Sequence, residues 1–340
     1  MSTIANFRNN KRVLLPWLAL LTVWIFWGST YLGIRAAVET IPPLLMAGFR
    51  FLLAGAVMYA VVAPKHARGE NRPTLVQLRS SLIIGAVLLV GGNGLLSVGE
   101  TGLESGLAAL IVATVPVWMV LINAVVTRTR ITKSMVLALV LGTIGVGLLM
   151  GGPGSGAINV AKAIIVLIAS VFWAAGSVYS RTAPLPSNPL VVTSLQMLAG
   201  GLLLIIAGAA TGEFGRLDLR AITANSLIGF FWLVLAGSML AFSAYVYANA
   251  NLPNDTVATY AYVNPVVAVI LGTLIGQEHI TLNLVLGGAV IVSAVALIVG
   301  GRARPRPADV EPGETETLDA PEKEQPRAES LQSTGAVRDQ

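Results

Sequence analysis

Aromatic and polar residues recur at helical spacing in an apolar stretch near the N-terminus. Trp24, Trp27 and Tyr31 follow one another at intervals of three and four residues, and Arg35 comes four residues later. Residues at these intervals share one face of a helix. Ring faces and hydrogen-bond donors on one helix face suit a small organic molecule that is uncharged or zwitterionic.

Similar groups lie within other apolar stretches, and we expect them to line one central cavity. Polar side chains inside membrane-spanning helices usually face protein or water and not lipid. The alternative for each single residue is a hydrogen bond between two helices. The predicted cavity residues are Trp24, Trp27, Tyr31, Asn93, Trp118, Trp173, Ser177, Tyr245, Tyr260 and Asn264.

Three charged residues form a separate candidate group. Arg35, Arg50 and Glu100 are expected near the outer ends of their helices, where they would form an ion-pair cluster or a gate. The alternative is structural pairing, or snorkelling of the arginines to the membrane surface. Glu278 is also expected at the outer boundary, as a cap or a pairing residue. No Asp, Glu, Lys or His is predicted at the bilayer midplane, so the sequence does not support a central proton relay.

Two prolines each fall near the middle of an apolar stretch. Pro116 and Pro265 lie 149 residues apart. A proline inside a helix removes the hydrogen bond to the carbonyl four residues back, which here frees the carbonyls of Val112 and Ala261. A single such proline is commonly a tolerated kink. Because the two prolines occur at matched depth, we expect both to be flexing points beside the cavity.

The composition places these residues in a polytopic membrane protein. Of the 340 residues, 55% are apolar and 11% are charged, and the mean hydropathy is +0.76. These values exclude a soluble domain. The absence of cysteine excludes disulfides and thiolate metal sites.

Ten apolar stretches are long enough to cross a membrane. A bilayer core of about 30 Å needs about 20 apolar residues in a helix. The sequence therefore predicts an all-α fold of ten transmembrane helices in two sets of five. The expected helices cover residues 14–37, 43–62, 80–99, 105–126, 133–150, 160–180, 189–211, 226–248, 255–276 and 282–300.

The two sets of five are expected to be repeats. The string from Phe26 to Tyr31 is partly repeated from Gly176 to Tyr179, and Gly28 and Gly176 lie 148 residues apart. Together with the spacing of the prolines, this agreement indicates a duplicated unit. Because five crossings is an odd number, the second repeat enters the membrane from the opposite side. Inverted repeats of this kind are typical of transporters.

Positive charges set the expected orientation. Of the Lys and Arg residues in predicted loops and ends, 14 lie on one side and four on the other. Lys and Arg favour the cytoplasmic side, so both termini are expected there, and the basic character reflects loops and not nucleic-acid binding. The predicted segments are a cytoplasmic N-terminal segment (1–13), a first repeat (14–150), a Gly-rich outer loop (151–159), a second repeat (160–300) and a disordered cytoplasmic tail (301–340).

The sequence offers no support for an enzyme. The eight acids before the tail are scattered, and the two histidines, His66 and His279, lie in predicted loops. No His-Glu-x-x-His, P-loop or dinucleotide-binding glycine pattern occurs. An intramembrane serine protease would need a histidine within the membrane. We therefore expect no catalysis, no metal site and no cofactor.

Several segments, taken in order, carry a resemblance to a known family. They are Phe26 to Tyr31 with Arg35, Pro42 and Pro43, Arg50 with Leu52 to Gly55, Ser105 to Pro116, Trp173 to Tyr179, Met197 to Gly200, and Ala258 to Glu278. In this order they resemble the drug/metabolite transporter superfamily, in its EamA-domain exporter branch. The stretch from Glu100 to Pro116 is especially similar to the bacterial drug/metabolite exporter type.

The resemblance covers residues 14–300 as two EamA units, and it implies a function. Its members are ten-helix carriers of the bacterial inner (plasma) membrane that export amino acids, their derivatives or drugs by alternating access. A small-molecule substrate, possible coupling to protons and a lipid bilayer are the implied partners. A broad multidrug exporter and a non-transport membrane scaffold or lipid-handling protein stay open as alternatives, as do substrate identity, direction of transport and oligomeric state.

Overall fold

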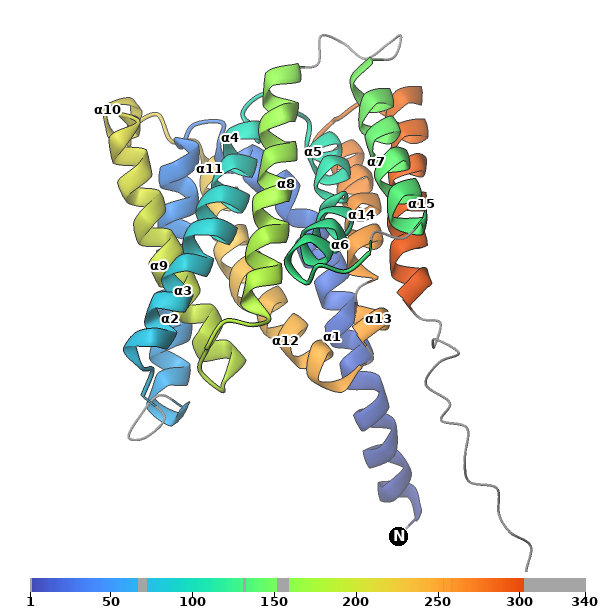
Figure 1. Cartoon of the computed structure of the whole chain (residues 1–340). Coiled ribbons are helices and arrows are strands. Elements are labelled where there is room, and N and C mark those ends of the chain that lie inside the picture. The colour runs from blue at the N-terminus through green and yellow to red at the C-terminus, as the bar shows by residue number, and fades with distance from the viewer. Residues whose placement is uncertain are drawn as a thin grey trace, which may run out of the picture. The chain divides into compact units, whose positions relative to one another are not determined.

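The structure, a computed structural model, describes residues 2–66, 72–130, 133–151, 159–252, 254–257 and 259–302. Most of the predicted Gly-rich loop and nearly all of the predicted tail lie outside these residues. The described chain is a bundle of helices (Figure 1). The first helix already begins at Ser2, so residues of the predicted N-terminal segment continue directly into it.

The elements divide at the Gly-rich loop. The first half contains α1 (Ser2–Ala37), α2 (Pro43–His66), α3 (Leu75–Ile84), the π-helix η2 (Gly85–Gly94), α4 (Leu95–Glu100), α5 (Ser105–Val112), α6 (Val115–Val126) and α7 (Lys133–Gly151). The second half contains α8 (Val160–Ser180), α9 (Pro189–Ala210), α10 (Glu213–Arg216), α11 (Ala224–Trp232), the π-helix η3 (Leu233–Leu240), α12 (Ala241–Asn251), α13 (Asn254–Val257), α14 (Tyr260–Leu274) and α15 (Leu282–Arg302).

Each of the ten predicted spans corresponds to an apolar helical segment. Seven are long enough to cross a bilayer, namely Leu14–Ala37, Pro43–Lys65, Leu75–Glu100, Ser105–Val126, Val160–Ser180, Pro189–Ala210 and Ala224–Ala248. Three are shorter, namely Met135–Leu149, Tyr260–Leu274 and Leu282–Leu297. The prediction of an all-helical, multi-pass membrane protein is confirmed.

The duplicated register is also visible in the backbone. The third and eighth spans each change from an α-helix to a π-helix, at Gly85 and at Leu233. These positions are 148 residues apart, the same separation as between Gly28 and Gly176. In Figure 1, α1 runs upward from the N-terminus whereas α8 runs downward from the top of the bundle. The helices that open the two halves therefore run in opposite directions.

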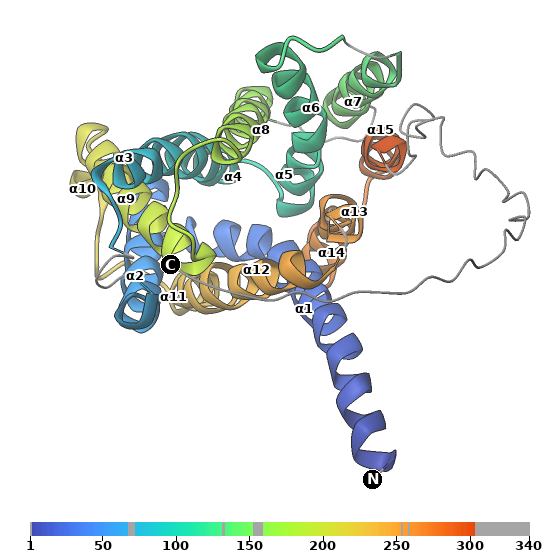
Figure 2. The same ribbon diagram turned by 60° about the horizontal axis from the view of Figure 1, so that its bottom comes forward.

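The two halves interleave across the whole bundle. The most extensive packing joins α2 to α9 and α7 to α15, followed by α1 with α14 and η2 with α8. Figure 2 shows α7 lying beside α15, and α1 beside α12 and α14. Each of these pairs takes one helix from each half. Residues for a shared site can therefore come from both halves.

Close helix packing depends on small residues at the crossings. On α7, a methyl group added at Gly145 would lie 2.6 Å from Ile291 Cγ1 and 3.0 Å from the Gly287 carbonyl oxygen on α15. On α15, a methyl group at Gly287 would lie 2.8 Å from the carbonyl oxygen of Gly145. Interfaces between membrane helices are held by such close approach, because lipid supplies no hydrophobic driving force between them.

We expect Gly145→Ala to lower the free energy of unfolding by about 1–3 kcal/mol, because the new methyl group overlaps Ile291 and forces the helices apart. Gly147→Ala on the same helix is the matched control, since nothing lies within 4 Å of the added methyl group. Alanine favours a helix over glycine by about 0.5–1 kcal/mol, so the control should be neutral or more stable. Thermal unfolding in detergent measures both, and equal loss of stability would contradict the packing argument.

Candidate functional site

Trp27 of α1 lies at the centre of a cluster of aromatic rings. Its ring centroid is 5.7 Å from that of Phe242, 5.1 Å from that of Tyr245 and 5.3 Å from that of Tyr260. The indole Nε1 donates a hydrogen bond of 3.1 Å to the carbonyl oxygen of Gly237. The cluster thus joins α1 to η3, α12 and α14. We call Trp27, Phe242, Tyr245 and Tyr260 the aromatic cluster.

Two further predicted cavity residues adjoin the aromatic cluster. Trp24 packs with Tyr245 against a small apolar core that includes Leu20, and its indole Nε1 is buried without a hydrogen-bond partner. The carboxamide of Asn264 lies 3.2 Å from the carbonyl oxygens of both Trp24 and Tyr260, so its Nδ2 faces them as donor. Asn264 therefore bridges α1 and α14. This agrees with the alternative stated above, in which a single polar residue forms a hydrogen bond between two helices.

Two glycines allow the helices to approach at this place. A methyl group at Gly28 would lie 2.6 Å from Val267 Cβ on α14. A methyl group at Gly237 would lie 2.7 Å from Thr30 Cγ2 and 3.2 Å from Arg50 Nη2. Glycine at position 237 thus leaves room for the guanidinium group of Arg50. Gly237 lies in a π-helix, a backbone form that is frequent at functional sites.

Four of the remaining five predicted cavity residues form a second group on η2, α6 and α8, and the fifth, Tyr31, lies on α1. Trp173 packs against Gly92, where an added methyl group would lie 3.0 Å from its ring. The Ser177 hydroxyl donates to the backbone carbonyl oxygen of Trp173. The Ser97 hydroxyl donates to the backbone carbonyl oxygen of Asn93. The indole of Trp118 donates to the hydroxyl of Thr114. The hydrogen bonds and ring contacts of the described residues do not join this second group to Trp27.

Glu278 joins Arg35 of α1 to the start of α5. Its carboxylate accepts a 2.9 Å hydrogen bond from Arg35 Nη1 and bonds of 2.7 and 3.0 Å from the backbone N–H groups of Ser105 and Gly106. The N-terminus of α5 therefore receives its negative charge from a loop more than 170 residues away in sequence. The sequence predicted Glu278 to be a cap or a pairing residue, and it is both.

Glu104 is the residue at the start of α5 that could have provided the cap from its own helix. Its side chain makes no capping hydrogen bond. Burial, followed by the neighbouring charge of Glu278, raises the pKa of the Glu104 carboxyl, while Arg35 and His279 act in the opposite direction. Both acids thus lie at the N-terminus of α5, and Glu278, not Glu104, accepts the hydrogen bonds from its backbone.

Arg50 differs from Arg35 because it forms no salt bridge with a carboxylate among the described residues. Its side chain on α2 is buried, and Nε donates a 2.9 Å hydrogen bond to the hydroxyl of Ser238 in η3. The guanidinium carbon also lies 4.7 Å from the centroid of the Phe51 ring. Nη1 is buried and has no hydrogen-bond partner. Arg50 thus has one unpaired donor, Nη1, while its Nη2 faces Gly237.

Glu100 is the corresponding acid without a partner. It ends α4 and is only 2% exposed. Among the described residues neither carboxylate oxygen has a close hydrogen-bond partner, and the backbone N–H of Arg35 acts only as a weak donor toward it. It interacts electrostatically with Glu278, Arg35 and Arg50. Tyr31 in turn interacts electrostatically with Glu100 and with Tyr260 of the aromatic cluster.

The prolines occupy two different settings. Pro265 lies inside α14, as predicted. Pro116 lies near the middle of the Ser105–Val126 span, as predicted, but the helix is interrupted at Ala113 and Thr114, so that Pro116 falls in the first turn of α6. The missing N–H of a proline is not needed in the first turn of a helix, so Pro116 is accommodated by interrupting the span.

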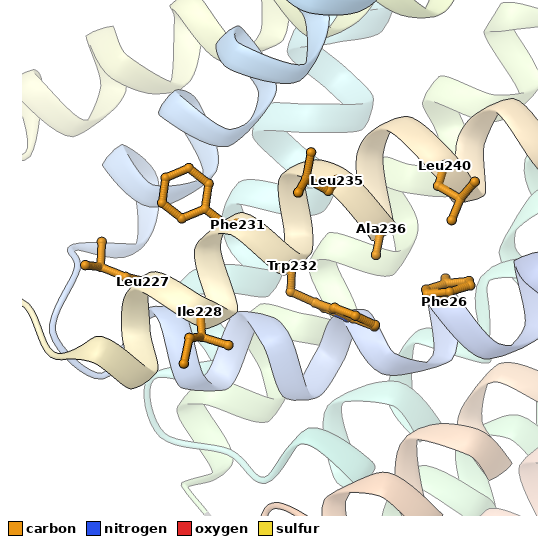
Figure 3. A pocket seen from close by; sticks show the side chains of 8 residues that line it. All are labelled: Phe26, Leu227, Ile228, Phe231, Trp232, Leu235, Ala236 and Leu240. Carbon is orange, nitrogen blue, oxygen red and sulfur yellow. The ribbon is translucent and has the colours of Figure 1, made fainter.

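An apolar groove lies on α1, α11 and η3, apart from the polar groups (Figure 3). The Phe26 and Trp232 rings face each other across it at 5.4 Å. Its lining is completed by exposed aliphatic and aromatic side chains, such as Ile228 and Leu235. None of the predicted cavity residues lines this groove, and a lining of this kind suits lipid chains better than a polar molecule.

The described residues contain no group of three or more Asp, Glu or His side chains that could hold a metal ion. The buried polar atoms without partners are instead an indole nitrogen, a guanidinium nitrogen, a serine hydroxyl and the two oxygens of one carboxylate. These groups can bind an organic molecule by hydrogen bonds and charge.

Comparison with protein families gives a match to the EamA-like transporter family over residues 14–151 and 161–300. The two matched segments coincide with the two halves described above. Together they cover most of the chain.

Individual proteins give consistent results. The chain is 40% identical over 298 residues to the uncharacterized inner membrane transporter YedA of Escherichia coli (strain K12), covering 86% of this chain and 93% of YedA. It is 27% identical to the uncharacterized transporter YvbV of Bacillus subtilis (81% and 88% covered) and 26% identical to protein PecM of Dickeya dadantii (80% and 88% covered). One crystal structure matches with a TM-score of 0.55 at 20% identity, covering 82% of this chain and 94% of the other, which supports the fold.

We expect Glu278→Gln to lower the free energy of unfolding by about 1–3 kcal/mol, because the buried neutral amide no longer balances Arg35 and accepts more weakly from α5. The matched control is Glu39→Gln, an exposed acid that accepts a hydrogen bond from Asn225. A surface change of this kind should stay within about 0.5 kcal/mol. Chemical unfolding in detergent compares the two variants, and a loss no larger for Glu278→Gln than for the control would contradict the role of Glu278.

Proposed function

Because the chain belongs to the EamA-like transporter family, we propose that it exports small uncharged or zwitterionic organic molecules, such as amino acids, their derivatives or drugs. Family membership makes the chain a membrane transporter and not an enzyme. It also leaves the scaffold alternative without support. The observation that carries the substrate proposal is the aromatic cluster around Trp27, which lies inside the bundle beside buried polar groups.

The chemistry of the aromatic cluster favours this class of substrate. Three ring systems within 6 Å of Trp27 offer apolar faces, while the tyrosine hydroxyls and nearby amides offer hydrogen bonds. Aromatic side chains bind organic molecules mainly through ring faces and contribute a polar group at one end. An inorganic ion would instead need several charged ligands in one place.

Alternating access is the mechanism we propose, with rocking of helices around the aromatic cluster. The cluster takes Trp27 from the first half and its other rings from the second half, so relative movement of the halves would open and close it. The ion pair of Arg35 with Glu278 joins α1 to the loop after α14. We propose that this pair is part of an outer gate, which breaks when the site opens to that side.

We further propose that the chain lies in a bacterial inner membrane with both termini in the cytoplasm. The unequal distribution of Lys and Arg supports this orientation, with 14 on one side and four on the other. The name of the relative YedA supports an inner-membrane location.

The direct test is flux of labelled amino acids and metabolites in proteoliposomes that contain the full chain, with and without a proton gradient. Flux that accelerates with the gradient supports coupling to protons, and gradient-independent flux supports facilitated transport. Flux of several unrelated toxic compounds would favour a multidrug exporter. No flux across a wide panel would contradict the proposal.

In the same assay, we expect Trp27→Ala to lower transport efficiency by about tenfold or more. Each aromatic pair contributes about 0.5–1.5 kcal/mol, and 1.4 kcal/mol corresponds to a factor of ten. Trp17→Ala is the matched control on the same helix, because Trp17 is 48% exposed and lies on the outside of the bundle. If both variants transport equally well, Trp27 has no role in the site.

We also expect Pro116→Ala and Pro265→Ala to slow the maximal transport rate severalfold. In α14 alanine would restore a backbone hydrogen bond and stiffen the helix, and in the fourth span it would favour a continuous helix across the break. Pro64→Ala, at the exposed end of α2, is the control. Initial rates at saturating substrate measure the effect. Normal rates in correctly inserted variants would show that these prolines are not flexing points.

A further inference from the structure

We propose that Arg50 and Glu100 bind the two ends of a zwitterionic substrate, with Arg50 taking its carboxylate and Glu100 its ammonium group. The apolar part of the substrate then lies against the aromatic cluster. This inference rests on the proposed transport function and assigns the charged part of its binding site.

The first observation is that both charged groups are buried and incompletely paired. Arg50 is 5% exposed and Glu100 is 2% exposed. Nη1 of Arg50 and both oxygens of Glu100 lack any hydrogen-bond partner. A charge removed from water is strongly unfavourable unless it is paired and hydrogen-bonded. A zwitterion that leaves water loses the hydrogen bonds of its carboxylate and its ammonium group. Arg50 and Glu100 could replace these bonds.

The second observation is that Arg50 and Glu100 do not satisfy each other. They interact electrostatically, yet within the described part of the chain the salt bridges join Arg35 to Glu278 and Arg216 to Glu213. Arg50 is held by the hydrogen bond from its Nε to Ser238 and by its contact with the Phe51 ring. A guanidinium group fixed in this way can still offer two parallel N–H donors to a carboxylate.

The third observation is that Arg50 adjoins the aromatic cluster and that Glu100 lies on a helix packed against α1. A methyl group at Gly237 would lie 3.2 Å from Arg50 Nη2, and the carbonyl oxygen of the same Gly237 accepts the hydrogen bond from Trp27. Glu100 ends α4, which packs against α1, the helix that carries Trp27. Both charged groups therefore come from helices that surround the aromatic cluster.

The other buried acids are already occupied. Glu278 accepts from Arg35 and from the backbone of α5. Glu213 accepts from the backbone N–H groups of Leu44 and Leu45 at the start of α2. Their bonds explain their burial, whereas in the described part of the chain Glu100 has only the backbone N–H of Arg35 as a weak donor toward it and no close hydrogen bond.

The test uses phenylalanine and two matched derivatives, N-acetylphenylalanine and phenylalaninamide, with the purified full chain. Binding is followed by selectively excited tryptophan fluorescence, to which Trp27 contributes. The acetyl derivative lacks the ammonium group and the amide lacks the carboxylate. A charge-assisted hydrogen bond contributes about 1.5–3 kcal/mol, so we expect each derivative to bind about 10- to 100-fold more weakly than phenylalanine.

The variants Arg50→Gln and Glu100→Gln separate the two ends. Arg50→Gln should abolish the preference for phenylalanine over its amide and keep the preference over the acetyl derivative. Glu100→Gln should do the reverse. Arg50→Lys keeps the charge and should restore part of the preference for the free carboxylate. Arg79→Gln and Glu39→Gln are matched exposed controls and should behave as the unaltered chain.

Two outcomes would overturn the inference. In the first, a variant weakens all three compounds equally, which means that its residue only supports the fold. In the second, the unaltered chain does not bind phenylalanine, or binds it no better than its two derivatives. Flux of other compounds from the wider panel would then leave the proposed transport function intact, whereas absence of all flux would contradict the function itself.

Discussion

Inside a membrane a buried charge must find its partner within the protein, because hydrocarbon offers neither hydrogen bonds nor counterions. The carboxylate of Glu278 meets this requirement for three parts of the chain at once: its own loop, Arg35 of α1 and the N-terminus of α5. The aromatic cluster depends on the same arrangement, because Trp27 lies two turns before Arg35 on α1 and Tyr260 lies on the helix that leads to Glu278. A single ionic contact thus fixes the helices that carry the proposed site.

The degree of pairing separates the buried charges into two kinds. Glu278 and Glu213 each accept two backbone N–H groups at a helix start, which is a structural use of a carboxylate. Arg50 and Glu100 are also buried, at 5% and 2% exposed, but keep unpaired atoms. Burying unpaired charged groups does not stabilise a fold. Their position is explained by a bound molecule that completes the pairing, as proposed above.

The sequence predicted the helices well because each span is a long apolar stretch with clear breaks. It also predicted that Trp27, Tyr245 and Tyr260 belong together, since polar and aromatic residues in spans turn inward. It could not show that Trp118 and Trp173 lie away from Trp27, on α6 and α8. Periodicity predicts which face of a helix is buried, but not which helix packs against that face. The pairing of Arg35 with Glu278 spans 243 residues and leaves no local signal. The break before Pro116 was missed because a proline alone indicates a kink as readily as an interruption.

The duplicated π-helices show how the two halves have come to differ. In each half a π-helix packs against the first helix of the other half, η3 against α1 and η2 against α8. At η3, Trp27 of α1 donates to the Gly237 carbonyl oxygen, and Arg50 of the neighbouring α2 donates to Ser238. At η2 the contact with α8 includes the Trp173 ring against Gly92 and Phe172 against Gly91, with Asn93 as an uncharged neighbour. The backbone has the same π-helical form at both places, whereas the Arg50 guanidinium lies at η3. A substrate held at η3 would therefore meet a different surface from one held at η2. An asymmetric site of this kind can bind a molecule whose two ends differ in charge.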